Sequence, residues 1–183
     1  MRTFCLVVLG TFLLLCKLAT AEVVDAEESG FKVVNKVFVD ASREDAWRAA
    51  VKDVDKWWSS DHTVSGDASR LRIDAKPQGC FCEGLGKNAG IVHMTVTMVF
   101  PPNVLRLTGG LGPLGLMGVE GNMTWEFDDV AGDTQVTFTY AVGGFRPDGL
   151  GAMAEPVDGV IEDALKRLQA YIDTGEAEYS DIE

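Results

Sequence analysis

The clearest helical pattern of hydrophobic positions lies near the end of the chain. Apolar side chains recur there three and four residues apart and form one stripe, which consists of Val157, Val160, Ile161, Ala164, Leu165, Leu168 and Ile172. Pro156 stands at the start of the stripe and Gly175 follows its end, as helix termini prefer. About 18 residues at roughly 1.5 Å each predict a helix of about 27 Å, long enough to cross a whole sheet.

The middle of the chain alternates with period two instead. In residues 90–100 the apolar positions Val92, Met94, Val96, Met98 and Phe100 alternate with polar ones. His93 belongs to the polar set, so the alternation places it on the solvent side. Similar runs predict strands at 32–40, 71–74, 80–85, 105–107, 123–127 and 136–142. Because every connection is short, the sheet should be antiparallel.

Two short helical segments should follow the first strand. Ser42 is a typical N-cap residue, with acidic residues in the next turn and an apolar stripe that includes Trp47. Residues 54–58 predict a second helical turn, and residues 59–67 a polar loop. The sheet then has one apolar face that only the long helix can cover. The predicted fold class is therefore α+β, a curved antiparallel sheet wrapped around a long C-terminal helix.

The first 21 residues have the pattern of a secretory signal peptide. Arg2 precedes an apolar stretch, and Ala19-Thr20-Ala21 forms a small-residue cleavage site before Glu22. The stretch is shorter than a membrane-spanning helix, so no stable membrane insertion is predicted after cleavage. The remaining chain divides into a flexible lead-in at 22–31, a domain at 32–175 and an acidic tail at 176–183. The expected location is periplasmic or secreted.

Composition narrows the possible functions. The chain has 183 residues, is 46% hydrophobic and carries a net charge of -12. These values fit one globular domain, and the negative charge argues against nucleic-acid binding. The sequence contains no P-loop, GxGxxG, GxSxG or HExxH pattern, so no cofactor is predicted.

Cys80 and Cys82 leave three alternatives. On a regular strand both side chains would share one face with geometry unsuited to a disulfide, which favours two packed thiols. A strained bridge between positions i and i+2 would need a bulge. Half of a metal site, completed by His62 or His93, is the third alternative. We predict no metal, because a second closely spaced pair of ligands is absent.

Ligand-binding candidates lie at the inward positions of the predicted strands and beside the second helix. They are Trp57, Trp58, Met94, Met98, Trp125, Phe138 and Tyr140. Trp57 and Trp58 are adjacent and cannot face the same way, so one should lie in the core and the other near a cavity mouth. For the strand residues the alternative to cavity lining is plain core packing.

Three residues are candidates for catalysis. His62, in the polar loop, can act as an acid or base near neutral pH. Tyr140 carries a phenol that needs a hydrogen-bond partner when buried, and a ligand could supply one. Glu83 would be poised for proton transfer if it points inward with Phe81, whereas an outward Glu83 is a solvated edge charge. The sequence leaves that choice open.

The order of these elements resembles the SRPBCC superfamily. The resemblance is carried by residues 37–42 leading to Trp47, the tryptophan pair at 57–58, residues 79–83, and Pro156-Val157 at the start of the last helix. The resemblance spans residues 32–173. Within the superfamily, the chain is similar to exported bacterial members of unassigned role. That superfamily includes START lipid-transfer domains, polyketide cyclases and homologues of heat-shock ATPase activators. The resemblance implies a helix-grip fold with a hydrophobic cavity, and it carries over no catalytic residue.

The favoured hypothesis is a binding or carrier module for a small hydrophobic molecule, a lipid or an aromatic compound, held between the sheet and the long helix. The alternative is a cyclase or dehydratase that uses His62 or Glu83 as a base and Tyr140 as an acid in the same cavity. An adaptor of the ATPase-activator kind fits an exported chain poorly, because its usual chaperone partner is cytosolic.

Overall fold

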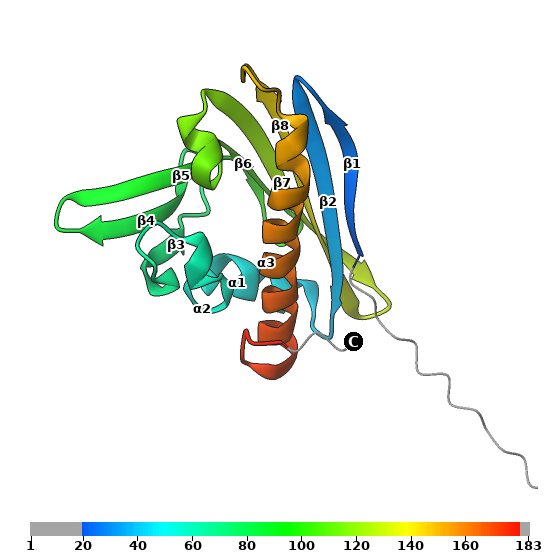
Figure 1. Ribbon diagram of the computed structural model, residues 1–183. Coiled ribbons are helices and arrows are strands. Elements are labelled where there is room, and N and C mark those ends of the chain that lie inside the picture. Colours follow the sequence, from blue (N-terminus) through cyan, green and yellow to red (C-terminus); the bar gives the residue numbers. More distant parts are fainter. Residues whose placement is uncertain (1–19, 180–183) are drawn as a thin grey trace, which may run out of the picture.

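The computed structural model describes residues 20–179, which form one antiparallel sheet and the helices that cover it (Figure 1). The strands are β1 (Thr20–Glu27), β2 (Gly30–Val39), β3 (Leu71–Ile73), β4 (Cys80–Gly86), β5 (Ala89–Phe100), β6 (Val104–Thr108), β7 (Val119–Val130) and β8 (Asp133–Gly144). The helices are α1 (Arg43–Lys52), α2 (Val54–Trp57), α3 (Ala154–Thr174) and the 3-10 turns η1 (Ser60–His62), η2 (Ala68–Arg70), η3 (Gly112–Leu116) and η4 (Gly151–Met153). The predicted signal peptide lies outside the described residues, apart from Thr20 and Ala21.

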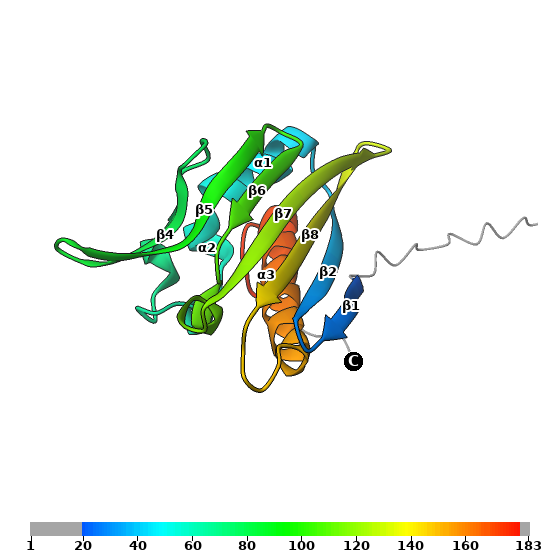
Figure 2. The same cartoon turned by 90° about the horizontal axis from the view of Figure 1, so that it is seen from above.

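The sheet has the strand order β1-β2-β8-β7-β6-β5-β4-β3, and every neighbouring pair is antiparallel. It curves around α3, as the view from above shows (Figure 2). α3 lies along β2, α1 contacts β3, β7 and β8, and α2 and the loop at 59–67 lie against β3 and β4. The β4–β5 hairpin extends away from the rest of the molecule (Figure 1). This arrangement confirms the α+β helix-grip fold predicted from the sequence.

The long helix forms where the apolar stripe predicts it. Ile161, Ala164, Leu165 and Leu168 are buried against the sheet, and Gly175 ends the helix in the left-handed conformation with φ 87°. The helix has 21 residues and begins at Ala154, two residues before Pro156. At the first helix, the Ser42 hydroxyl accepts a hydrogen bond from the Asp45 amide at 3.2 Å, the capping contact that the sequence indicates.

Both ends of the domain are more ordered than the composition suggests. β1 pairs along β2 over most of the stretch predicted as a flexible lead-in at 22–31, because the edge of β2 offers unpaired backbone groups to any extended segment. Part of the predicted acidic tail lies against α3, where the Tyr179 hydroxyl donates to Asp163 at 2.8 Å and Ala177 is buried. Residues 180–183 lie outside the described part of the chain.

Two bulges interrupt the alternation of β5. Phe81 pairs with Met94 and Cys82 with Val92, so His93 is the extra residue opposite β4. On the other side of the strand, Val96 pairs with Leu107 and Met98 with Arg106, so Thr97 is the extra residue opposite β6. A bulge of this kind changes which face the side chains next to it occupy. The first bulge changes the orientation of His93, and the second changes that of Met98.

Candidate functional site

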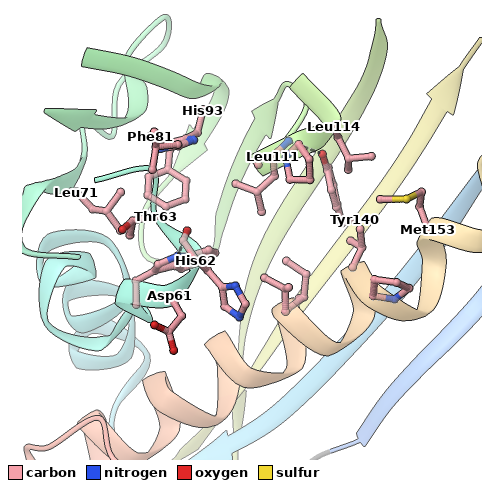
Figure 3. Close-up of a pocket in the computed structure, with 18 of the residues that line it drawn as sticks. Asp61, His62, Thr63, Leu71, Phe81, His93, Leu111, Leu114, Tyr140 and Met153 are labelled. Carbon is pink, nitrogen blue, oxygen red and sulfur yellow. Dashed lines mark hydrogen bonds between the residues drawn. The ribbon is translucent and has the colours of Figure 1, made fainter. Parts of the chain in front are cut away.

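A cavity of about 370 Å³ lies between α3, η3, the loop at 59–67 and the facing strands (Figure 3). Most of its aliphatic walls come from two segments. Leu111, Leu114 and Leu116 belong to the glycine-rich loop between β6 and β7, and Val157, Val160 and Ile161 belong to α3. Leu114 is buried, whereas Leu116 is 92% exposed at the rim. The cavity is therefore bounded mainly by apolar side chains.

The tryptophan pair is divided between cavity and core. Trp58 lines the cavity and contacts Phe81 edge to face, with ring centroids 5.2 Å apart. Its indole N–H donates to the backbone carbonyl of His62 at 3.2 Å. Trp57 points into the core, where its indole donates to the carbonyl of Ala49 and its ring contacts Trp125. The two side chains face different ways, as their adjacency predicts.

Tyr140 reaches the cavity, but its hydroxyl is already engaged by the protein. It donates to the carbonyl of Gly109 at 2.9 Å and accepts from the amide of Leu111 at 3.0 Å. Burial raises the pKa of Tyr140 to about 12, although the Leu111 bond acts in the opposite direction. The buried phenol thus has the hydrogen-bond partners that it needs, and the backbone supplies them where a ligand could have done so. Tyr140 anchors the glycine-rich loop instead of offering a free acidic proton.

Glu83 points inward, which resolves the choice that the sequence leaves open. Its side chain is fully buried, and its carboxylate accepts from the amides of Val64, at 3.0 Å, and Ser65. The third partner is His93, whose Nε2 lies 2.9 Å from the same carboxylate. Burial alone would raise the pKa of Glu83. Hydrogen bonds from Ser65, Val64 and His93 outweigh burial and lower that pKa from 4.5 to about 2.

His93 faces the cavity, so the solvent-facing position predicted for it is wrong. Its side chain is 8% exposed, lines the cavity and lies beside Phe81, with ring centroids 5.6 Å apart. The reason is the bulge, which turns His93 toward the face that Met94 occupies. Strict alternation would have sent it outward. No pattern in the sequence marks this bulge, but a His and a Glu on two strands joined by a hairpin form a pair worth testing.

His62 and Asp61 lie at the lower side of the cavity in Figure 3, across from Leu114 and Tyr140. Both residues are exposed, and they belong to the 3-10 turn η1 that follows the tryptophan pair. The structure therefore brings His62 and Tyr140 to one cavity and places Glu83 behind its wall, in contact with His93.

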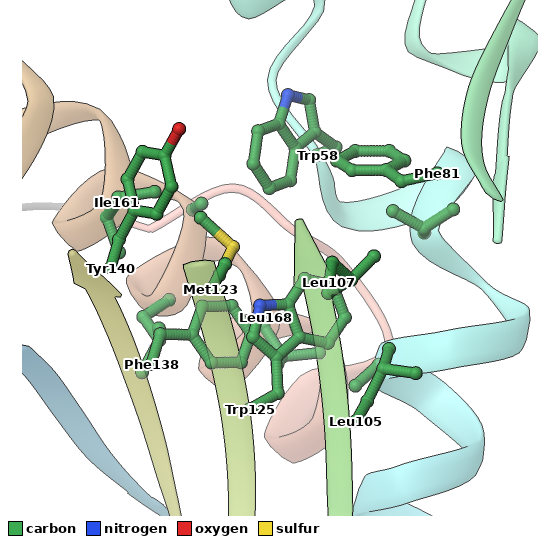
Figure 4. Close-up of a cluster of buried hydrophobic side chains, with 14 of the residues drawn as sticks. Trp58, Phe81, Leu105, Leu107, Met123, Trp125, Phe138, Tyr140, Ile161 and Leu168 are labelled. Atoms are coloured by element: carbon green, nitrogen blue, oxygen red, sulfur yellow. The ribbon is translucent and has the colours of Figure 1, made fainter. Parts of the chain in front are cut away.

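Most of the other ligand-binding candidates are core residues. Met94, Trp125 and Phe138 are buried outside the lining of the cavity, and Trp125 stacks on Phe138 with centroids 4.3 Å apart (Figure 4). Met98 is 39% exposed, so its predicted inward orientation is wrong. The bulge at Thr97 reverses the strand phase there and turns the partly buried Val99 inward in its place.

Cys80 and Cys82 form a disulfide, so the favoured prediction of two packed thiols is wrong. Their Cα atoms are 5.4 Å apart, closer than on the regular strand assumed from the sequence. The bulge that such a bridge requires is present on the partner strand, between the pairs of Phe81 and Cys82. Within residues 20–179, no three His, Cys, Asp or Glu side chains gather as metal ligands.

Sequence reasoning missed several cavity residues. Leu111, Leu114 and Leu116 were recognisable only as apolar residues in a glycine-rich loop, and Val157 and Val160 only as part of the helix stripe. Because loop conformation and helix rotation decide which of them border empty space, the pattern alone could not assign them. In the described part of the chain, every helix is too short or too polar to cross a membrane.

The fold and the cavity together define a helix-grip protein with an apolar internal site. Residues 30–173 match the family described as polyketide cyclase / dehydrase and lipid transport. This match covers most of the chain, which therefore belongs to that family and to the SRPBCC type that its sequence resembles. No curated protein matches the chain significantly.

Solved structures share the fold at low sequence identity. EF2215 of Enterococcus faecalis, a conserved protein of unknown function, superposes with a TM-score of 0.59 at 15% identity over 90% of this chain and 82% of its own. CalU16 of Micromonospora echinospora has a TM-score of 0.51 at 16% identity, over 87% and 86%. An Arthrobacter aurescens protein solved by NMR has a TM-score of 0.56 at 13% identity, over 88% and 99%. These likenesses concern the fold alone.

Proposed function

We propose that this protein binds and carries a small hydrophobic molecule in the cavity between its sheet and α3. The observation that carries the proposal is the cavity of about 370 Å³ with mainly aliphatic and aromatic walls. Its volume falls in the range of about 300 to 1,000 Å³ that is common for small-molecule sites. Burial of about 200 Å² of apolar ligand surface would offer about 5 kcal/mol before the cost of immobilisation.

Native mass spectrometry of the protein purified from its own source tests this proposal. A retained ligand should appear as an additional mass in the native spectrum and disappear under denaturing conditions. Extraction of the same sample into an organic solvent should recover an apolar molecule of that mass. A native spectrum identical to that of the extracted protein, together with no uptake of added apolar compounds, would contradict the proposal.

One observation favours a second candidate function, a cyclase or dehydratase in the same cavity. His93 is an imidazole held against a buried carboxylate at the cavity wall, an arrangement that orients imidazole for proton transfer. Tyr140 fits the acid role poorly, because both hydrogen-bonding capacities of its hydroxyl are in use. Loss of water from a hydrophobic β-hydroxy ketone, followed by mass spectrometry, is the test. A rate equal to the uncatalysed one would count against this function.

A further inference from the structure

The polar part of the cavity contains two histidines in different environments. The chain has two histidines in all, and both line the cavity. His62 is exposed in η1, whereas His93 is nearly buried and its Nε2 lies 2.9 Å from Glu83. Only a fixed imidazole can impose a direction on a hydrogen bond to a ligand. Of the two histidines, His93 is therefore the one that can recognise a ligand directionally.

The surroundings of Glu83 determine which nitrogen of His93 carries a proton. The carboxylate already accepts two backbone amides, from Val64 and Ser65, and those donors favour its ionised form. An ionised carboxylate only accepts hydrogen bonds, so Nε2 of His93 must donate to it. In the neutral imidazole, Nδ1 then carries a lone pair. Among the described residues, none donates a hydrogen bond to Nδ1.

Aromatic side chains surround His93 on one side of the cavity. Phe81 lies 5.6 Å from the imidazole and Trp58 lies 5.2 Å from Phe81, each distance measured between ring centroids. The α3 side of the cavity presents aliphatic chains such as Val160. A ligand carboxylate would be disfavoured by the net charge of -12 and by Asp61 in the lining. A neutral O–H group can instead donate to Nδ1 without bringing charge into the cavity.

We propose that His93 is the residue that determines ligand specificity, and that the ligand is a flat aromatic or conjugated molecule whose hydroxyl group donates to Nδ1. This inference rests on the proposed function, because it names the class of molecule that the apolar cavity binds. Glu83 is the positioning residue, since it fixes the tautomer and the orientation of the imidazole. Ethers of the same shape lack the donor and should bind more weakly.

A matched pair of fluorescent probes tests the inference, 2-naphthol and 2-methoxynaphthalene. At a pH of about 8, the wild-type protein should bind 2-naphthol about tenfold more tightly than 2-methoxynaphthalene, as one hydrogen bond allows. His93→Phe should reduce this ratio to about one and keep the affinity for the methyl ether. His62→Phe should keep the ratio near ten, even if both affinities change.

The outcomes separate this inference from the proposed function. If neither probe binds the wild-type protein, both proposals fail. If both probes bind with equal affinity, the cavity is a hydrophobic site and the inference about His93 is overturned. Loss of the ratio in His62→Phe, with retention in His93→Phe, overturns it as well.

A measurement on the wild-type protein avoids any folding defect of the variants. With ¹⁵N-labelled histidine, the two imidazoles give two sets of NMR signals. Without ligand, His93 should show its proton on Nε2. Addition of 2-naphthol should shift the Nδ1 signal of His93, and 2-methoxynaphthalene should leave it in place. A proton on Nδ1 in the free protein, or no response to 2-naphthol, would overturn the inference.

Discussion

Glu83 shows how backbone donors allow a charge to be buried. The amides of Val64 and Ser65 and the ring of His93 lower its pKa to about 2, against the effect of burial. Because the folded pKa lies below the ordinary 4.5, the unfolded chain binds the proton more readily. The stabilisation from Glu83 is therefore complete above pH 4.5 and is lost as pH falls toward 2.

We predict that Glu83→Gln flattens this part of the pH profile. Between neutral pH and a pH of about 2.5, the wild-type protein should lose about 2 to 3 kcal/mol more of its free energy of unfolding than the variant. Urea denaturation at both pH values measures the difference. Equal losses in the two proteins would show that Glu83 is not ionised in the folded state as described.

Tyr140 holds the glycine-rich loop that closes one side of the cavity. Its hydroxyl bridges Gly109 and Leu111, and its ring lies so close to Gly121 that an added Cβ there would approach a ring carbon to 2.5 Å. Removal of the hydroxyl would leave a partly buried carbonyl and a partly buried amide without this partner. The loop should then be held only by its own apolar contacts.

Tyr140→Phe should therefore lower the free energy of unfolding by about 1 to 3 kcal/mol, the cost of leaving such groups unsatisfied. Chemical denaturation monitored by tryptophan fluorescence measures this change. Tyr171→Phe is the matched control, because Tyr171 is a half-buried residue of α3. This substitution should lower the free energy of unfolding by less than about 1 kcal/mol. If both substitutions have the same small effect, the bridge to the loop contributes nothing.

At the scale of elements, the apolar stripe of α3 contributes side chains to the core and, one turn away, to the cavity wall. Ala164 is 2% exposed and packs in the core, whereas Val160, one turn earlier, lines the cavity. Ala164→Phe should overpack the core and cost about 1 to 3 kcal/mol. Val160→Phe should extend into empty space and cost less than about 1 kcal/mol. Thermal and urea unfolding of the pair measure the difference, and a reversed order would place the cavity elsewhere.

The periodicity of single elements predicts their type well and their irregularities poorly. The stripe on α3 and the alternation of β7 and β8 follow from side-chain spacing, so the helix-grip fold could be predicted. The bulges at His93 and Thr97 arise from how β5 pairs with β4 and β6, which one strand's sequence does not encode. They explain the errors at His93 and Met98.

The candidate site was predictable where it depends on local rules and not where it depends on distant contacts. The division between Trp57 and Trp58 follows from their adjacency. The hydroxyl of Tyr140 bonds to backbone groups about 30 residues away in the glycine-rich loop. The carboxylate of Glu83 accepts from backbone amides of the polar loop at 59–67. The sequence predicts both loops by composition alone and says nothing of these contacts. β1 was missed for a related reason, since an edge strand needs backbone pairing more than an apolar pattern.

At the scale of the whole molecule, the cavity results from how the curved sheet is covered. α3 lies along β2, and the core between it and the sheet is filled by stacked rings such as Trp125 on Phe138 (Figure 4). Toward β4 and β5 the cover consists of short helices and loops, which pack less completely against the sheet. The empty volume therefore lies at one end of a solid core.

Titration of the folded protein with 2-methoxynaphthalene tests the central claim most directly. The apolar cavity predicts saturable binding of one probe per chain, with a Kd of about 0.1 mM or tighter. Val160→Phe should weaken this binding at least about tenfold, whereas Ala164→Phe should retain it in the fraction that is folded. Absence of saturable binding to the wild-type protein, or equal binding by Val160→Phe, would contradict a ligand-binding cavity under α3.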